Sequence, residues 1–344
     1  MSVLIPWLRE DFDVNSYVRN VVTLHFGPEG SEYAHDLLKK GVRPEDLCTL
    51  DDCRAILPLE KDGIILEHDS EYFIPKKLLK EEPQKLVSGR SSGTTGPQKT
   101  VPWHADTVGK VMEWMDWNFD RLRLPRGRDL LYVGPTGLFQ DGMEAIAARR
   151  GGKGVPVILD NPGEVKKAFS APESRRGMAA YIADKIVAAM KNENNVGTVV
   201  SLGPPLEYLK EMGDISKVDA FVVGGFGTTP EEYRKLKHQY DGKVLQETYG
   251  NIFWFWAFNT DDAGGNLNYS PQYPHFSFDA VNPDTGESVG YGNEGQVAGM
   301  RITKELLFRW KERDAGILLR GTEEMPWNGI KNVRPVSAYL SEKR

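Results

Sequence analysis

Five short apolar runs, separated by longer amphipathic stretches, limit the possible folds of this chain more than any other sequence feature. They are LLYVG at 130–134, VPVIL at 155–159, VGTVVSL at 196–202, VDAFVVGG at 218–225 and KVLQE at 243–247. Apolar strands that alternate with helices are typical of a largely parallel sheet covered on both faces. We therefore predict an α/β fold with mostly parallel sheets covered by helices.

The stretches between these runs carry helix signals. Val108, Val111, Met115, Phe119 and Leu122 recur at helical spacing. In TTPEEYRKLK at 228–237, Thr229 is a candidate N-cap, Pro230 suits the first turn and Glu232 completes a capping box. The sequence thus predicts helices on either side of the runs.

The two ends of the chain differ from this middle part. The first 80 residues are charged and predict a helical subdomain or lid, with SEYAHDLLKKGVRPEDLCTLDDCRAILP at 31–58 giving a helix, a stop at Gly41 and two capped turns. After the turn-rich loop NTDDAGGNLNYS at 259–270, residues 275–302 predict two strands joined by a Pro-Asp-Thr-Gly turn. We therefore predict a helical region at 1–85 packed on the main domain, an α/β core at 86–258 and a smaller β-rich part at 259–344.

Charge and cysteine content narrow the class of protein. The 344 residues carry a formal net charge of −6, which gives no basic field for nucleic acid or an anionic membrane. Cys48 and Cys53 do not form a C-x-x-C motif, and so few cysteines suit a reducing compartment. The start MSVLIPWLRE meets proline and charge too early for a signal peptide or a membrane span. We expect a cytoplasmic protein.

The segment GRSSGTTGPQKT at 89–100 is the main candidate for chemistry. Serine and threonine hydroxyls, flexible glycine backbone and the charge of Lys99 suit a phosphate, although a plain surface loop has the same composition. It is not a Walker A loop, because Gln98 stands where that motif needs glycine and KTVPW favours extended backbone over a helix. The loop is therefore predicted to join two extended segments as a hairpin tip.

These residues resemble the phosphate loop of the adenylate-forming enzymes, which join a carboxylate to AMP. Ser91-Ser92-Gly93-Thr94-Thr95-Gly96 and Lys99 match, with Pro97 and Gln98 exchanged relative to the usual G-x-P-K. Over about residues 17–335 the chain is similar to the phenylacetate–CoA ligase branch. The matching segments are KKGVRPEDLCTLDDCRAILPLEKD at 39–62, GPTGLFQDGMEAIAARRGGKGVPVIL at 134–159, VVGGFGTTPEEYRKLKHQYDGKVLQETYG at 222–250 and FRWKERDAG at 308–316.

The resemblance implies ATP and Mg²⁺ as cofactors and assigns a role to each matching position. Ser92, Thr94, Thr95 and Lys99 would hold the outer phosphates, with Ser91, Gly93 and Gly96 completing that loop. Gly224, Gly225 and Phe226 would approach the adenine, on which Tyr249, followed by Gly250, would stack. Asp314 would accept the ribose hydroxyls. Gly137, Phe139 and Trp254 would contact the acid. For several of these positions the sequence alone leaves open an ordinary turn, core or surface role.

Two departures separate the chain from that family. The family follows Y-G with x-T-E, whose threonine meets the α-phosphate and whose glutamate holds Mg²⁺, but here Ile252 and Phe253 stand in those places. Glu247 is the candidate metal ligand, with a solvated charge as its alternative. Residues 252–258 are either a buried core strand, which we favour, or aromatic walls for a flat acid. The chain also stops at GIKNVRPVSAYLSEKR, which resembles the hinge, so the mobile C-terminal domain and its lysine are expected to be missing.

Two functions remain open on the sequence. The first is an enzyme that activates a hydrophobic or aromatic carboxylic acid as its acyl-adenylate and passes it to CoA, an amine or a protein. Lys99, Lys331 or a partner's lysine would then supply the missing charge. The second is a degenerate nucleotide-binding homologue acting as a subunit or sensor. The intact loop favours catalysis. A partner protein that supplies the acceptor or the missing domain is plausible, and so is a homodimer.

Overall fold

The structure is a computed structural model. It describes residues 12–61, 63–91, 98–159, 164–165, 168–169, 171–225, 227–260, 266–322, 325 and 327–342. Three of the predictions fall on other residues: the N-terminal segment 1–11, the loop tip 92–97 that holds Ser92, Gly93, Thr94, Thr95 and Gly96, and Phe226. These lie outside the described residues.

The N-terminal region is mostly helical, as predicted. Its helices are α1 (Val14–Phe26), α2 (Glu32–Lys39), α3 (Leu50–Ile56), α4 (Ile64–Glu67) and α5 (Lys76–Glu81), with 3₁₀ turns at Pro44–Asp46, Ser70–Phe73 and Pro83–Lys85 and one short strand, β1 (Glu60–Lys61). Thr49 and Asp52 form a capping box that starts α3. Strand β1 pairs with a strand of the C-terminal part, so this region is joined to the C-terminal sheet by backbone hydrogen bonds.

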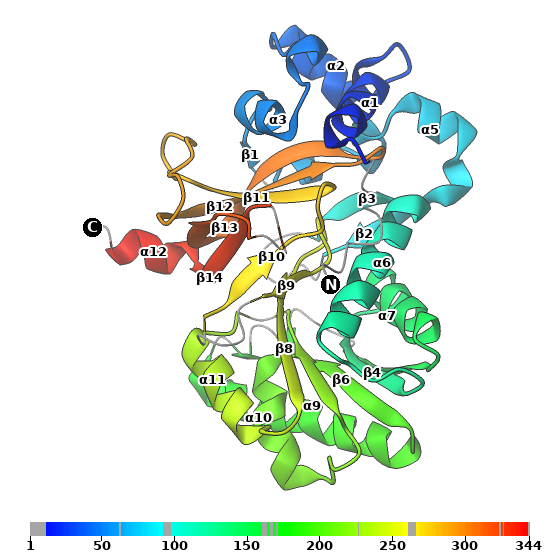
Figure 1. Ribbon diagram of the computed structural model, residues 1–344, viewed down its shortest axis with the longest axis vertical. Helices are drawn as coiled ribbons and strands as arrows, with labels where there is room; N and C mark the ends of the chain where they lie inside the picture. The colour runs from blue at the N-terminus through cyan, green and yellow to red at the C-terminus, as the bar shows by residue number, and fades with distance from the viewer. Residues whose placement is uncertain are drawn as a thin grey trace.

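The five apolar runs form five strands. They are β4 (Asp129–Gly134), β5 (Gly154–Ile158), β6 (Val196–Ser201), β7 (Ala220–Val223) and β8 (Val244–Tyr249), parallel in the order β5-β4-β6-β7-β8. Helix α6 (Ala105–Arg121) precedes these strands, and the helices between them are α7 (Leu138–Arg149), α9 (Pro172–Asn192), α10 (Gly203–Met212) and α11 (Pro230–Gln239). Figure 1 shows α6 and α7 on one side of these strands and α9 to α11 on the other. Every residue of β4, β6 and β7 is buried, as a sheet covered on both faces requires.

The sheet continues into the C-terminal part with a change of direction. Strand β8 pairs antiparallel with β9 (Ala257–Asn259), and the order runs on through β10 (Asn268–Ser270), β14 (Gly329–Pro335), β13 (Leu307–Leu319), β12 (Glu294–Ile302) and β11 (Phe276–Val281), before helix α12 (Val336–Glu342). The predicted pair of strands at 275–302 is confirmed as β11 and β12. The predicted domain boundary after residue 258 falls inside β9, and the three-part division stays a prediction.

The predicted hairpin around the serine- and glycine-rich loop is present. Strand β2 (Leu86–Arg90) pairs antiparallel with β3 (Thr100–His104), from Leu86 opposite His104 to Arg90 opposite Thr100. Helix α6 follows β3 directly, and the His104 side chain accepts the Asp106 N–H as its N-cap. The loop thus projects from a two-stranded ribbon and does not cap a helix, as KTVPW predicted.

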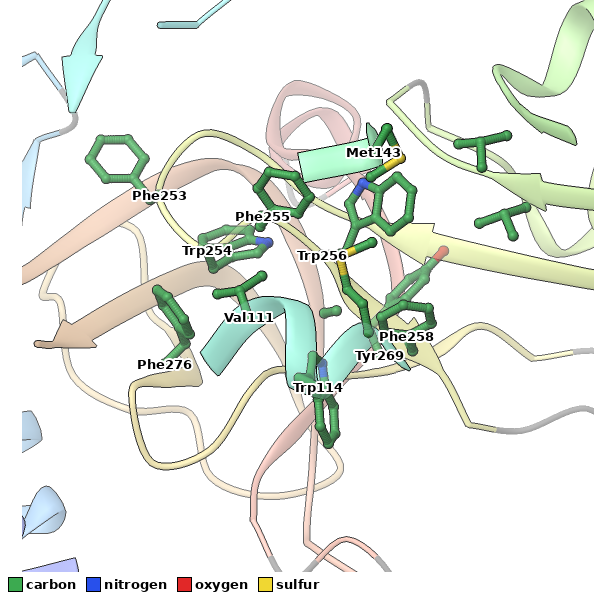
Figure 2. Close-up of a cluster of buried hydrophobic side chains, with 14 of the residues drawn as sticks. Val111, Trp114, Met143, Phe253, Trp254, Phe255, Trp256, Phe258, Tyr269 and Phe276 are labelled. Carbon is green, nitrogen blue, oxygen red and sulfur yellow. The ribbon is translucent and has the colours of Figure 1, made fainter. Parts of the chain in front are cut away.

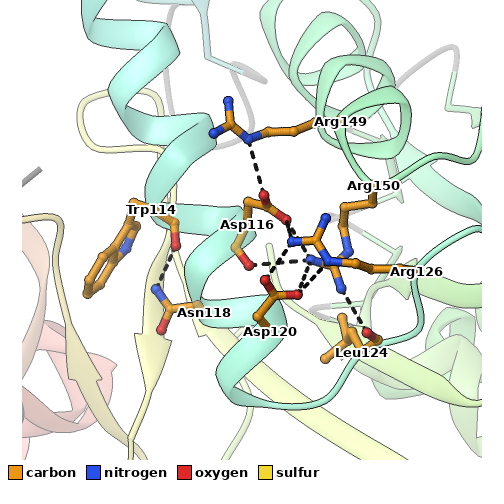
Figure 3. Close-up of polar contacts among 8 residues, drawn as sticks. All are labelled: Trp114, Asp116, Asn118, Asp120, Leu124, Arg126, Arg149 and Arg150. Atoms are coloured by element: carbon orange, nitrogen blue, oxygen red, sulfur yellow. Dashed lines mark hydrogen bonds and ion pairs between the residues drawn. The ribbon is translucent and has the colours of Figure 1, made fainter. Parts of the chain in front are cut away.

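A buried charge cluster joins the C-terminal ends of α6 and α7 (Figure 3). The Asp116 carboxylate accepts hydrogen bonds from Arg150 at 2.6 Å, Arg126 at 2.9 Å and Arg149 at 3.1 Å. Arg150 is 3% exposed at its side chain and also donates to the Leu124 carbonyl at 2.7 Å. Gly137 is the N-cap of α7, and Phe139 lies in its first turn. The cluster therefore holds in place the helix that carries these two predicted acid-binding residues.

We expect Arg150→Met to lower the free energy of unfolding by about 2–3 kcal/mol, because Leu124 and Asp116 lose a charged donor in a buried place. The matched change Arg126→Met removes an arginine that is 48% exposed from the same carboxylate, and should cost less than about 1 kcal/mol. Urea denaturation of both variants measures the difference. Equal losses would contradict the role given to Arg150.

His25 anchors α1 to the C-terminal part. Its imidazole lies 3.2 Å from the Ser31 hydroxyl and 3.1 Å from the Thr303 carbonyl oxygen, and it is fully buried. Burial lowers the pKa of His25 from 6.5 to about 4. The folded protein therefore keeps this ring neutral over a range in which the unfolded chain binds a proton.

The pKa shift of His25 has a defined effect on stability. Below pH 6.5 the unfolded state takes up a proton that the folded state refuses, so stability falls as the pH is lowered towards 4. When the pH falls from 7.5 to 5, the free energy of unfolding of His25→Gln should decrease by about 2 kcal/mol less than that of the wild type. Carboxyls with a raised pKa, such as Glu312, change stability with the opposite sign. The quantity to measure is therefore the difference in unfolding free energy between the wild type and the variant at each pH. His238→Gln, at an exposed histidine, should leave the pH dependence unchanged.

Candidate functional site

Two hydrogen bonds close the base of the serine- and glycine-rich loop. The Ser91 N–H donates to the Lys99 carbonyl at 2.9 Å, and the Lys99 N–H donates to the Ser91 hydroxyl at 2.8 Å. The ammonium of Lys99 lies 5.9 Å from the centre of the Phe253 ring. The Lys99 ammonium, at the base of the loop, therefore lies close to Phe253 in the segment that follows Tyr249.

Tyr249 and Asp314 meet although 65 positions separate them. The Tyr249 hydroxyl, at the end of β8, donates to Asp314 Oδ2 on β13 at 2.9 Å. Burial and the negative charges of Asp314 and Glu312 raise the pKa of Tyr249 well above its usual value, which keeps the phenol a neutral donor. The structure thus brings together the residues predicted for the adenine and for the ribose.

The predicted glycines lie at the carboxyl ends of neighbouring parallel strands. Gly224 directly follows β7, and a Cβ there would lie 2.3 Å from the Thr248 hydroxyl. Gly225 has φ +75°, a conformation that favours glycine. Gly250 follows β8, and a Cβ on it would lie 2.0 Å from the Phe255 carbonyl oxygen. Close packing thus requires Gly224 and Gly250, at the edge where open α/β sheets bind ligands.

Glu312 is a site residue that the sequence reasoning missed. Its Oε1 accepts hydrogen bonds from the Asn251 amide at 2.8 Å and from the Trp310 indole N–H. Removal from solvent and the charge of Asp314 raise the pKa of Glu312 to about 7, while Trp310, Lys99 and Asn251 act against that rise. The available signal was the period of two along β13, which places residues 310, 312 and 314 on one face.

Glu247 occupies a different environment from the one expected of a metal ligand. It is 2% exposed on β8, and burial raises its pKa well above the usual value, against hydrogen bonds from Tyr269 and Thr228. Burial disfavours the charged form that a metal ligand needs. The metal role of Glu247 stays a prediction.

The residues predicted for the acid fall into two aromatic groups, of which Figure 2 labels Trp254, Phe255 and Trp256. Phe139, two residues after Gly137, stacks on Phe255 with ring centres 6.2 Å apart and meets Trp256 edge-on at 6.1 Å. Trp254 packs the other way, onto the β-rich part, with its ring 5.6 Å from Trp310. Gly137 itself has φ +82° as the N-cap of α7. The structure does not bring Phe139 and Trp254 into contact.

The segment after Tyr249 is core, as we favoured, but it is not a strand over its whole length. Residues 253–258 are all buried, whereas only Ala257–Asn259 form a strand. Phe255 has φ +67°, which is rare for a bulky residue. Since Gly250 and Phe255 pack in direct contact, the backbone turns here and does not extend.

A buried ion pair fixes this segment to the hairpin. Arg301 and Glu305 form an ion pair, and neither side chain is exposed. The Arg301 guanidinium lies 3.9 Å from the centre of the Trp103 ring and donates to the Phe253 carbonyl at 3.3 Å. Trp103 in turn donates its indole N–H to the Ile252 carbonyl at 3.1 Å. The β2–β3 hairpin and residues 252–253 are therefore both held against Arg301 of β12.

Arg301→Gln should destabilise the protein by about 3–5 kcal/mol, because Glu305 would remain buried without its cation. Arg19→Gln removes one partner of an exposed ion pair with Asp13 and should cost less than about 1 kcal/mol. Guanidinium denaturation followed by tryptophan fluorescence compares the two variants. A loss below about 1 kcal/mol for Arg301→Gln would refute the role of this pair.

Comparison with known proteins identifies the fold. No model of a known family matches the sequence, and no curated protein matches it. An open conformation of 2-hydroxyisobutyryl-CoA ligase in complex with 2-HIB-AMP and CoA matches with a TM-score of 0.66 at 12% identity, over 92% of this chain and 72% of that chain. The same ligase in its thioesterification state matches with a TM-score of 0.67 at 13% identity, over 93% and 66%.

At these identities the likeness establishes the fold alone. The chain has the α/β fold of the adenylate-forming ligases, so the predicted fold class is confirmed. The predicted resemblance to that superfamily holds at the level of the fold, and the phenylacetate–CoA ligase branch stays a prediction. Within the part of the chain that the structure describes, no helix has the length and apolar character to cross a bilayer.

Proposed function

We propose that this protein binds ATP and activates a hydrophobic or aromatic carboxylic acid as its acyl-adenylate. One observation carries the proposal: Lys99, Tyr249 and Asp314 lie in one connected group. Tyr249 at the end of β8 bonds to Asp314 on β13. Lys99 at the loop base lies over the Phe253 ring, and the charges of Lys99 and Asp314 both act on Glu312. Three distant segments thus supply a cation, an aromatic ring and a carboxylate. The fold shared with the 2-hydroxyisobutyryl-CoA ligase supports the same function.

Each residue has a definite part in the proposed reaction. Tyr249 stacks on the adenine, and its hydrogen bond orients Asp314, whose carboxylate accepts the ribose hydroxyls. Lys99 and the loop hydroxyls stabilise the charge that develops as the carboxylate attacks the α-phosphate and pyrophosphate leaves. Phe139 with Phe255 offers an aromatic wall to the acid. The acyl group then passes to a thiol, an amine or a protein.

A magnesium ion fits the donor set at Glu312 better than at Glu247. Glu312 is partly exposed beside the loop base, whereas Glu247 is enclosed. When bound, Mg²⁺ would neutralise part of the triphosphate charge. We also place the protein in the cytoplasm and in the phenylacetate–CoA ligase-like branch, in keeping with its two unpaired cysteines and its motif order respectively.

A second candidate function is nucleotide binding without catalysis. Its support is Phe253, which lies where the related enzymes carry a glutamate and is buried against Trp310 at 4.4 Å between ring centres. A subunit or sensor of this kind would keep Lys99, Tyr249 and Asp314. It would show ATP binding without turnover.

ATP–pyrophosphate exchange with Mg²⁺ and a panel of aryl and alkyl carboxylic acids tests the proposal. We expect exchange with one class of acid, and a loss of about 100-fold or more in Lys99→Ala, because one preorganised donor is removed from the transition state. Lys110→Ala removes a lysine that is 42% exposed on α6 and should leave exchange unchanged. Calorimetry with ATP accompanies each assay.

The outcomes separate the candidates. ATP binding without exchange for any acid would favour the second function over the first. No ATP binding by the wild-type chain would refute both. Exchange that survives in Lys99→Ala would remove Lys99 from the catalytic residues.

A further inference from the structure

We propose that Glu312 is the protein ligand of the magnesium ion that accompanies ATP, in place of the carboxylate that the chain lacks at position 253. The inference rests on the proposed function and adds a metal-binding residue to it. Three observations support it: the hydrogen bonds to the Glu312 carboxylate, its place beside Phe253, and the burial of Glu247.

Among the described residues, the hydrogen bonds to the Glu312 side chain all end on one oxygen. Asn251 at 2.8 Å and the indole N–H of Trp310 both donate to Oε1. Two donors on one oxygen fix the orientation of the carboxylate, and Oε2 is left to take a ligand. Outer partners of this kind are typical of carboxylates that bind metals.

Glu312 lies beside Phe253, and both contact Trp310. The Phe253 ring stacks on Trp310 with centres 4.4 Å apart and lies 5.9 Å from the ammonium of Lys99. Glu312 bonds to the same indole, and the charge of Lys99 acts on it. Position 253, in the turn after β8, carries no carboxylate. The Glu312 carboxylate of β13 lies beside it.

The charges around Glu312 suit a hydrated divalent ion. Mg²⁺ keeps several waters and binds through one or two carboxylates together with phosphate oxygens, so a single well-held glutamate suffices. Asp314 adds a second negative charge nearby. Glu247, the other acid near the carboxyl ends of the strands, is 2% exposed, so solvent and a hydrated ion reach it less easily than they reach Glu312.

Calorimetric titration with ATP in EDTA and in Mg²⁺ tests the assignment without measuring turnover. For the wild type, Mg²⁺ should tighten ATP binding about 10-fold or more. Glu312→Gln retains the acceptor for Asn251 and Trp310, so it should bind ATP in EDTA about as well as the wild type and lose the gain from Mg²⁺. Glu294→Gln, at a glutamate that is 27% exposed and paired with Arg334, should keep the full gain.

Further variants make the result decisive. Glu312→Asp keeps the charge but shortens the side chain, and it should retain only part of the Mg²⁺ effect. It also replaces Glu312→Gln if that variant does not fold. Mn²⁺ with ATP should give a protein-bound electron paramagnetic resonance spectrum in the wild type that is absent in Glu312→Gln.

Three results would overturn the assignment. One is a full gain from Mg²⁺ in Glu312→Gln, above all together with its loss in Glu247→Gln. Another is a wild type whose ATP affinity is the same in EDTA and Mg²⁺. If pyrophosphate exchange is present in either case, the proposed function stands and only the metal ligand is wrong. Absence of ATP binding would refute the proposed function and this assignment with it.

Discussion

The buried ion pair of Arg301 and Glu305 is the constraint on which the site depends. Arg301 lies under the Trp103 ring and bonds to the backbone of Phe253, while Glu305 accepts the Thr107 hydroxyl of α6 at 2.9 Å. A buried arginine is tolerated only where its donors and charge are matched. The hairpin, the turn after β8 and α6 are therefore fixed by one guanidinium–carboxylate pair.

Fold and site were predictable from the sequence to different degrees. Apolar runs marked all five parallel strands, and Thr229 with Glu232 marked the start of α11, because burial and capping act locally. Glu312 escaped notice since its role comes from Asn251, 61 positions away. The irregular turn at 251–256 also escaped, because its apolar letters are equally those of a strand and only tertiary contacts choose between them.

The hydrogen bond from Tyr249 to Asp314 crosses between two kinds of sheet. Tyr249 ends the last parallel strand, whereas Asp314 lies on β13 among antiparallel strands. A ligand that contacts both residues would bind at the change of strand direction, where side chains from either part converge. This explains why the candidate site draws on residues from nearly the full length of the chain.

The packing around residues 252 and 253 has a consequence for how such a sequence changes over time. Ile252 fills the space over Gly89, where even a Cβ would lie 2.5 Å away, and Phe253 stacks on Trp310. Threonine and glutamate at these positions would leave a gap beside Gly89 and bury a charge against an indole. Residues 252 and 253 therefore form one packing unit with Gly89 and Trp310, and a change of these two residues alone would not give a well-packed site.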